Sequence, residues 1–110
     1  MARFIGAPSD RGVVFTKNVT EAVNLVANTW GAANLRAGDA VVLTEMEHHA
    51  NLVPWQMVAK RTGAILDHVP MGDDFRLDLA AYEEKLGPDV KIVAVTGMSN
   101  VLGILPPIRF

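Results

Sequence analysis

The chain has 110 residues, of which 50% are hydrophobic and 20% are charged, and its formal net charge is −2. This is the composition of one globular domain or of part of a larger one, and its scattered basic residues predict no nucleic-acid partner. Cysteine is absent, which excludes disulfides and thiolate metal sites and fits a reducing compartment. With no apolar run of membrane-spanning length and no signal-peptide pattern, we expect a cytoplasmic protein with no membrane partner.

The hydrophobic pattern predicts four strands that alternate with three helices. Short runs rich in β-branched residues indicate buried strands at 13–16, 40–44, 64–69 and 91–96. Apolar spacing, together with residues that start and stop helices, predicts helices at 20–30, 52–62 and 77–86. Pro54 is placed in the first turn of the second helix, where its missing N–H costs nothing, and Gly63 ends that helix.

The alternation of strands and helices predicts an α/β fold: a mostly parallel sheet with helices on its faces, joined by right-handed crossovers. Near-continuous apolar strands in so short a chain indicate burial by a larger body. We find no repeat and no internal domain boundary, so residues 1–110 are expected to form one unit. Because the chain stops after a strand and a loop, we expect it to be part of a larger three-layer sandwich.

Polar segments follow three of the predicted strands, at 17–20, 45–51 and 97–103. Ligands of open α/β sheets bind at the carboxyl ends of the strands, so these segments are expected to face one crevice. The first segment opens a helix, whose free N–H groups and Thr20 hydroxyl would suit a phosphate group. The alternative is that Thr20 or Asn18 caps the helix, and the segment alone favours the cap.

The second segment carries two adjacent histidines. If the backbone is extended there, His48 and His49 point in opposite directions and only one faces the crevice. An imidazole in that place could stack on an aromatic ligand or shuttle protons, whereas without further context a loop histidine bonded to its neighbours is the simpler interpretation. A metal site would have to recruit Glu47 and His68 as well, and His68 lies in another strand, so we expect no metal site.

The third segment offers Ser99 and Asn100 to the polar edge of a ligand, although both are also common turn formers. Neither a GxGxxG nor a GxxxxGK[ST] motif occurs, so dinucleotide and P-loop sites have no motif behind them.

Taken together, the segments resemble the large, cofactor-binding domain of the class V aminotransferase superfamily. These are fold-type I enzymes of pyridoxal 5'-phosphate (PLP), and the resemblance is strongest to the group II cysteine desulfurases and the selenocysteine lyases. It runs from about Arg3 to Pro107, and its most specific part is the Glu-His-His-Ala-Asn-x-x-Pro-Trp string at 47–55. The other matching strings lie at 20–27, 38–39 and 99–103.

The resemblance implies a role for four residues. Thr20 would bind the PLP phosphate, His48 would stack on the pyridine ring and take part in proton transfer, and Asn100 would contact the ring hydroxyl or the substrate side. Val19 belongs to the same phosphate-binding turn but stands where the family often has threonine, so one phosphate hydroxyl is lost. Ile104 is a second departure, because the family commonly has threonine after the matching glycine.

The resemblance also implies the activity of a longer parent enzyme. That parent would be a cytoplasmic homodimer that converts L-cysteine to L-alanine and an enzyme persulfide, and passes the sulfur to an acceptor protein of iron–sulfur cluster assembly. The Schiff-base lysine and the acceptor cysteine lie beyond Phe110 in the family, so the chain alone is expected to be inactive. The alternatives are a selenocysteine lyase acting on L-selenocysteine, another class V enzyme, or a non-catalytic α/β module for a phosphorylated small molecule.

Overall fold

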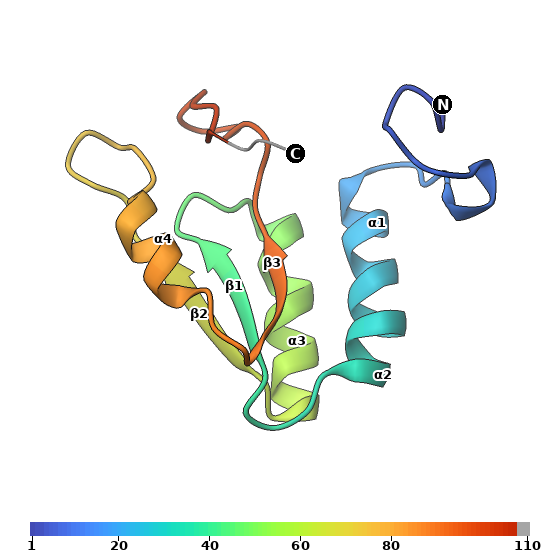
Figure 1. Cartoon of the computed structure of the whole chain (residues 1–110), viewed down its shortest axis with the longest axis horizontal. Coiled ribbons are helices and arrows are strands. Elements are labelled where there is room, and N and C mark those ends of the chain that lie inside the picture. Colours follow the sequence, from blue (N-terminus) through green and yellow to red (C-terminus); the bar gives the residue numbers. More distant parts are fainter. Residues whose placement is uncertain (108–110) are drawn as a thin grey trace.

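Three of the predicted strands form a parallel sheet in the computed structural model, which describes residues 1–107 (Figure 1). The strands are β1 (Ala40–Thr44), β2 (Ile65–Val69) and β3 (Val90–Ala94), in the order β2-β1-β3 across the sheet. β1 pairs in parallel with both neighbours, as Leu43 opposite His68 and Ala94 illustrates. The predicted parallel α/β fold is confirmed, and the predicted strands at 64–69 and 91–96 differ from β2 and β3 only at their ends.

The first helix is longer than one regular α-helix. α1 (Val19–Val26) continues without a break through the π-helical turn η2 (Ala27–Gly31) into α2 (Ala32–Asn34), because the joining residues keep right-handed helical angles. This rod includes the helix predicted at 20–30. A short 3-10 turn, η1 (Asp10–Gly12), precedes it.

The end of the second helix and the start of the third lie at residues that favour such ends. A 3-10 turn, η3 (His49–Asn51), leads into α3 (Val53–Thr62), which ends at Gly63 in the left-handed conformation with φ of 80°. α4 (Leu79–Lys85) begins after Asp78, whose side chain accepts a 3.0 Å hydrogen bond from the Ala81 N–H. α4 starts two residues later than predicted because Leu77 still pairs with Met71 in an isolated bridge.

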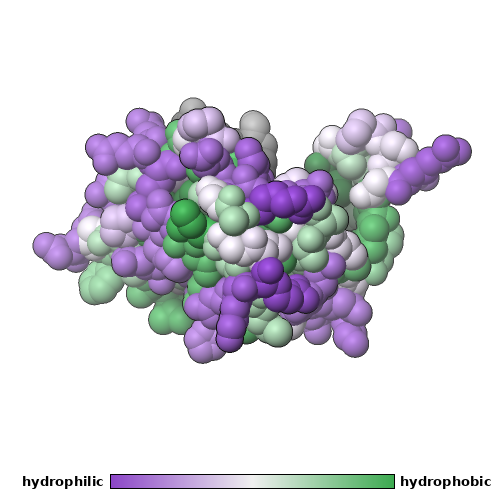
Figure 2. Space-filling view, turned by 90° about the horizontal axis from the view of Figure 1, so that it is seen from below, coloured by the Kyte–Doolittle hydropathy of each residue, from purple (hydrophilic) through white to green (hydrophobic). Residues whose placement is uncertain are grey.

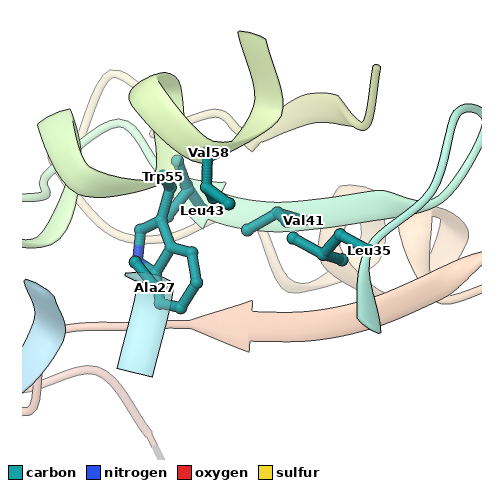
Figure 3. Close-up of a cluster of buried hydrophobic side chains, with 6 residues drawn as sticks. All are labelled: Ala27, Leu35, Val41, Leu43, Trp55 and Val58. Carbon is teal, nitrogen blue, oxygen red and sulfur yellow. The ribbon is translucent and has the colours of Figure 1, made fainter. Parts of the chain in front are cut away.

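The core lies between the sheet and the helical layer formed by α3 and the α1 rod (Figure 3). β1 is buried from Val41 to Thr44, as its central position requires. α4 packs against β2, where Lys85 Nζ lies 2.6 Å from Asp67 Oδ1. The buried apolar side chains at the centre of the core are Ala27, Leu35, Val41, Leu43, Trp55 and Val58.

The strand predicted at 13–16 is wrong. Within residues 1–107 this segment has no strand partner, and Val14 and Phe15 remain 69% and 76% exposed. An extended segment becomes a strand only when a neighbour takes its backbone hydrogen bonds, and here the chain runs into the start of α1, away from both edges of the sheet (Figure 1). β-branched composition therefore indicated a strand that the described residues do not pair.

Apolar side chains also reach the surface elsewhere. Figure 2 shows green, apolar groups among purple, polar ones on one face of the molecule. Phe4 and Val101 are among the most exposed large apolar residues. Among residues 1–107, the helices are all too short or too polar to cross a bilayer.

We predict that Leu43→Ala lowers the free energy of unfolding by about 2–5 kcal/mol, because it opens a cavity under α3 at a fully buried position. The matched control is Leu79→Ala, which removes the same atoms from a side chain that is 47% exposed and is expected to cost no more than about 0.5 kcal/mol. Urea unfolding followed by circular dichroism measures both values. Equal losses in the two variants would contradict the assigned core.

Candidate active site

The three polar segments lie on the side of the molecule where the strands of the sheet have their carboxyl ends. β1 and β3 are parallel, so their carboxyl ends lie on the same side, and the first turn of α1 lies at that side too (Figure 1). η3, which follows β1, packs directly against α1. The predicted meeting of 17–20 with 45–51 is therefore present in the structure.

The start of α1 is capped by Asn18 and not by Thr20. Asn18 Oδ1 accepts a 2.8 Å hydrogen bond from the Glu21 N–H, and Glu21 in turn accepts a 2.8 Å bond from the Lys17 N–H. This arrangement resembles a capping box, except that Glu21 accepts from the N–H of the residue before the cap and not from the N–H of Asn18 itself. The cap therefore leaves the Thr20 hydroxyl free of that task, and the N–H groups of Val19 and Thr20 have no carbonyl partner within the helix.

His48 adopts an extended backbone conformation and precedes η3, and its ring contacts the turn that follows. Its Nδ1 accepts a 3.1 Å hydrogen bond from the Ala50 N–H, so the proton of the neutral imidazole lies on Nε2. The loop-histidine interpretation is thus correct as far as this bond goes. It also fixes which nitrogen remains available to a ligand.

The prediction that only one of the two histidines faces the crevice required an extended backbone at both residues, and this condition is not met at His49. His48 and His49 line the same concavity, with ring centroids 6.1 Å apart and planes tilted by 45°. The alternation of a strand does not apply here because His49 already begins the 3-10 turn of η3. Both histidines therefore belong to the candidate site.

The concavity has a volume of about 300 Å³ and lies between the start of α1 and the start of α3. Thr20 and Asn24 form its α1 side, while the opposite side combines the two imidazoles with small and apolar groups. The lining residues are Thr20, Asn24, His48, His49, Ala50, Val53 and Pro54. A hydroxyl beside a helix start, opposite flat and apolar groups, suits a ligand with one anionic end and one ring.

Asn100 is not among the residues that line this concavity. It is exposed in a tight loop after β3, in which the Ser99 N–H donates to the Ile104 carbonyl at 2.9 Å and the Gly103 N–H donates to the Ser99 carbonyl at 2.9 Å. Ser99 itself is buried, and its hydroxyl accepts from the Leu102 N–H at 3.2 Å. Ser99 thus acts as a turn former, and a ligand contact of Asn100 stays a prediction.

Glu47 is the residue that the sequence analysis missed, since it was considered only as part of a metal site that we did not expect. Its Oε1 accepts from the Thr44 hydroxyl at 2.6 Å and from the Thr96 N–H at 2.9 Å, and its Oε2 accepts from Asn51 Nδ2 at 2.7 Å. One carboxylate thereby joins the ends of β1 and β3 to η3. The only sequence signal was its place inside the most specific of the matching strings.

Comparisons with known proteins show the family of the chain. The family model of the class-V aminotransferases matches residues 1–109. The chain is 50% identical over 107 residues to a probable cysteine desulfurase of Synechocystis and 50% identical over 109 residues to a cysteine desulfurase of Haloferax volcanii, covering 97% and 98% of the chain and 26% of each relative.

Two solved structures show the same fold. A cysteine desulfurase from Thermococcus onnurineus superposes with a TM-score of 0.88 at 40% identity, over 97% of the chain and 26% of that protein. A cysteine desulfurase from Escherichia coli gives 0.87 at 39% identity, over 96% of the chain and 27% of that protein. The chain therefore belongs to the aminotransferase class-V family, and it spans about a quarter of the length of these relatives.

We predict that Asn18→Ala lowers the free energy of unfolding by about 1 kcal/mol, because it removes the cap of α1. Thr20→Ala is expected to change it by less than about 0.5 kcal/mol, because the Thr20 side chain does not form that cap. Urea unfolding of both variants measures the difference. A larger loss of unfolding free energy in Thr20→Ala than in Asn18→Ala would contradict this assignment and indicate that Thr20 caps the helix.

Proposed function

We propose that the chain is the cofactor-binding part of a PLP-dependent cysteine desulfurase, which converts L-cysteine to L-alanine and leaves the sulfur as a persulfide on an enzyme cysteine. The observation that carries the proposal is the meeting of Thr20 and His48 in one concavity beside a helix start. The names of relatives that are 46–50% identical support the choice of reaction. The unit 1–110 is then part of the large domain, with no boundary inside it.

The residues of the concavity fit PLP. The Thr20 hydroxyl and the first N–H groups of α1 offer an anion site at one end, and a helix N-terminus adds a favourable dipole. Val19 would contribute its amide group, since its side chain has no hydroxyl. At the other end, imidazole and the apolar groups of Val53 and Pro54 provide walls for a flat ring. When bound, PLP supplies an electron sink for bond cleavage at the amino acid.

His48 is proposed to do two things with one ring. Its face packs against the pyridine ring, and its Nε2 holds or gives a proton beside the substrate. The bond from the Ala50 N–H to Nδ1 supports this division, because it orients the ring and keeps the mobile proton on the other nitrogen. Asn100 is proposed to contact the ring hydroxyl or the substrate side from the loop after β3.

The chain alone is proposed to be inactive. Two of its lysines are already paired away from the concavity, Lys85 with Asp67 at 2.6 Å and Lys91 with Asp39 at 3.8 Å. Both lie outside the motif that would identify a Schiff-base lysine. Cysteine, which would accept the sulfur, does not occur in the sequence.

The resemblance supports three further parts of the proposal: a homodimeric parent, a sulfur-acceptor protein of iron–sulfur cluster assembly, and a cytoplasmic location. A selenocysteine lyase would use the same concavity, and a comparison of L-cysteine with L-selenocysteine as substrates of the full-length enzyme separates the two. A non-catalytic module for a phosphorylated small molecule would release no alanine from either substrate.

We predict that His48→Ala in the full-length enzyme retains PLP but lowers kcat for L-cysteine by at least about a hundredfold, because the proton-transfer group is lost. Alanine formation measures turnover, and absorbance of the purified protein measures bound PLP. The control is His68→Gln, on β2 and outside the concavity, which should keep most of the activity. Undiminished turnover in His48→Ala would remove His48 from the catalytic residues.

A further inference from the structure

We infer that Glu47 is a positioning residue, which holds His48 at the cofactor through a hydrogen-bond network that ties three segments together. The inference rests on the proposed function, since it concerns the placement of His48 in that site. Glu47 precedes His48 directly and does not itself line the concavity. Its effect on the reaction must therefore pass through its neighbours.

The network joins elements that are far apart in the chain. The two contacts to Oε1 come from Thr44, at the buried end of β1, and from the backbone of Thr96, just after β3. The contact to Oε2 comes from Asn51, at the end of η3. Both ends of the segment 47–51 are thus held, and the two histidines lie between them.

The network reaches into the core through Asn51. Its Oδ1 accepts a 3.1 Å hydrogen bond from Trp55 Nε1, and Trp55 is a buried member of the core in α3. The loop that carries His48 is therefore fastened to a rigid layer rather than only to solvent-exposed groups. A side chain held in this way can keep a catalytic group within the narrow limits that proton transfer and stacking require.

The donors around Glu47 require an acceptor with two oxygens. An ionised carboxylate only accepts hydrogen bonds and here receives three of them. In Glu47→Gln, the amide oxygen can still accept from Thr44 and Thr96, but the new NH2 group would meet the NH2 group of Asn51. In Asn51→Asp, two carboxylates would meet instead. Either single change breaks the link to η3.

The double change should restore the link with its polarity reversed. In Glu47→Gln/Asn51→Asp, the glutamine NH2 donates to the new carboxylate, whose second oxygen still accepts from Trp55 Nε1. The matched control is Glu45→Gln, the same substitution two residues earlier, where the amide oxygen can still accept the 3.0 Å bond from the Met71 N–H. These four proteins separate the loss of one hydrogen bond from the loss of a charge.

The experiment uses the full-length enzyme and two readouts. The first is the NMR signal of the His48 ring in the apoenzyme labelled at histidine Cε1, assigned by its loss in His48→Ala. It should shift in both single variants and return in the double variant, while the His68 signal stays in place. This readout needs neither PLP nor turnover, so it tests Glu47 even if the proposed reaction is wrong.

The second readout is turnover of L-cysteine by the PLP-loaded enzyme. Each single variant should lose roughly tenfold in kcat with little change in KM or bound PLP, and the double variant should recover to within about threefold of wild type. Glu45→Gln should behave as wild type. Single variants with an unmoved His48 signal and full kcat would overturn the inference, and so would a folded double variant without recovery. A wild type that makes no alanine would instead refute the proposed function.

Discussion

The carboxylate of Glu47 is the contact on which the candidate site depends. It receives hydrogen bonds from the ends of two neighbouring strands and from η3, so the edge of the sheet and the loop over it form one connected structure. In a parallel sheet, the loops that follow neighbouring strands begin side by side. The polar groups at the start of these loops have no partner in the sheet and need another hydrogen-bond acceptor or donor. At the carboxyl ends of β1 and β3, Glu47 accepts hydrogen bonds from the Thr44 hydroxyl and the Thr96 N–H, and His48 follows it directly in the chain.

The start of α1 supplies the second half of the site. Asn18 caps the helix, and Thr20 lines the concavity that His48 lines from the other side. The start of α1 suits an anionic group and the imidazole suits a flat ring. PLP has both a phosphate and a pyridine ring. The fold therefore brings two segments, separated in sequence by a strand, to one concavity.

Local sequence patterns predicted most of the fold. β1, α3 and its stop at Gly63 follow from apolar periodicity and from the conformations that proline and glycine favour. The strand predicted at 13–16 does not form, because a strand depends on a partner strand that local composition cannot reveal. The arrangement of the two histidines could not be predicted for a similar reason: opposite directions required an extended backbone, and the chain turns into η3 at His49.

The site was predictable in part. The polar segments that carry Thr20 and His48 indicated that these residues meet, although the strand expected before Thr20 does not form. The capping of α1 by Asn18 rather than Thr20 needed side-chain geometry, and the three donors around Glu47 come from three separate segments. The most direct test of the account is a crystal structure of the full-length enzyme with PLP. We predict phosphate oxygens within hydrogen-bond distance of the N–H groups of Val19 and Thr20, and the pyridine ring against His48. A phosphate bound elsewhere, or a ring remote from His48, would contradict it.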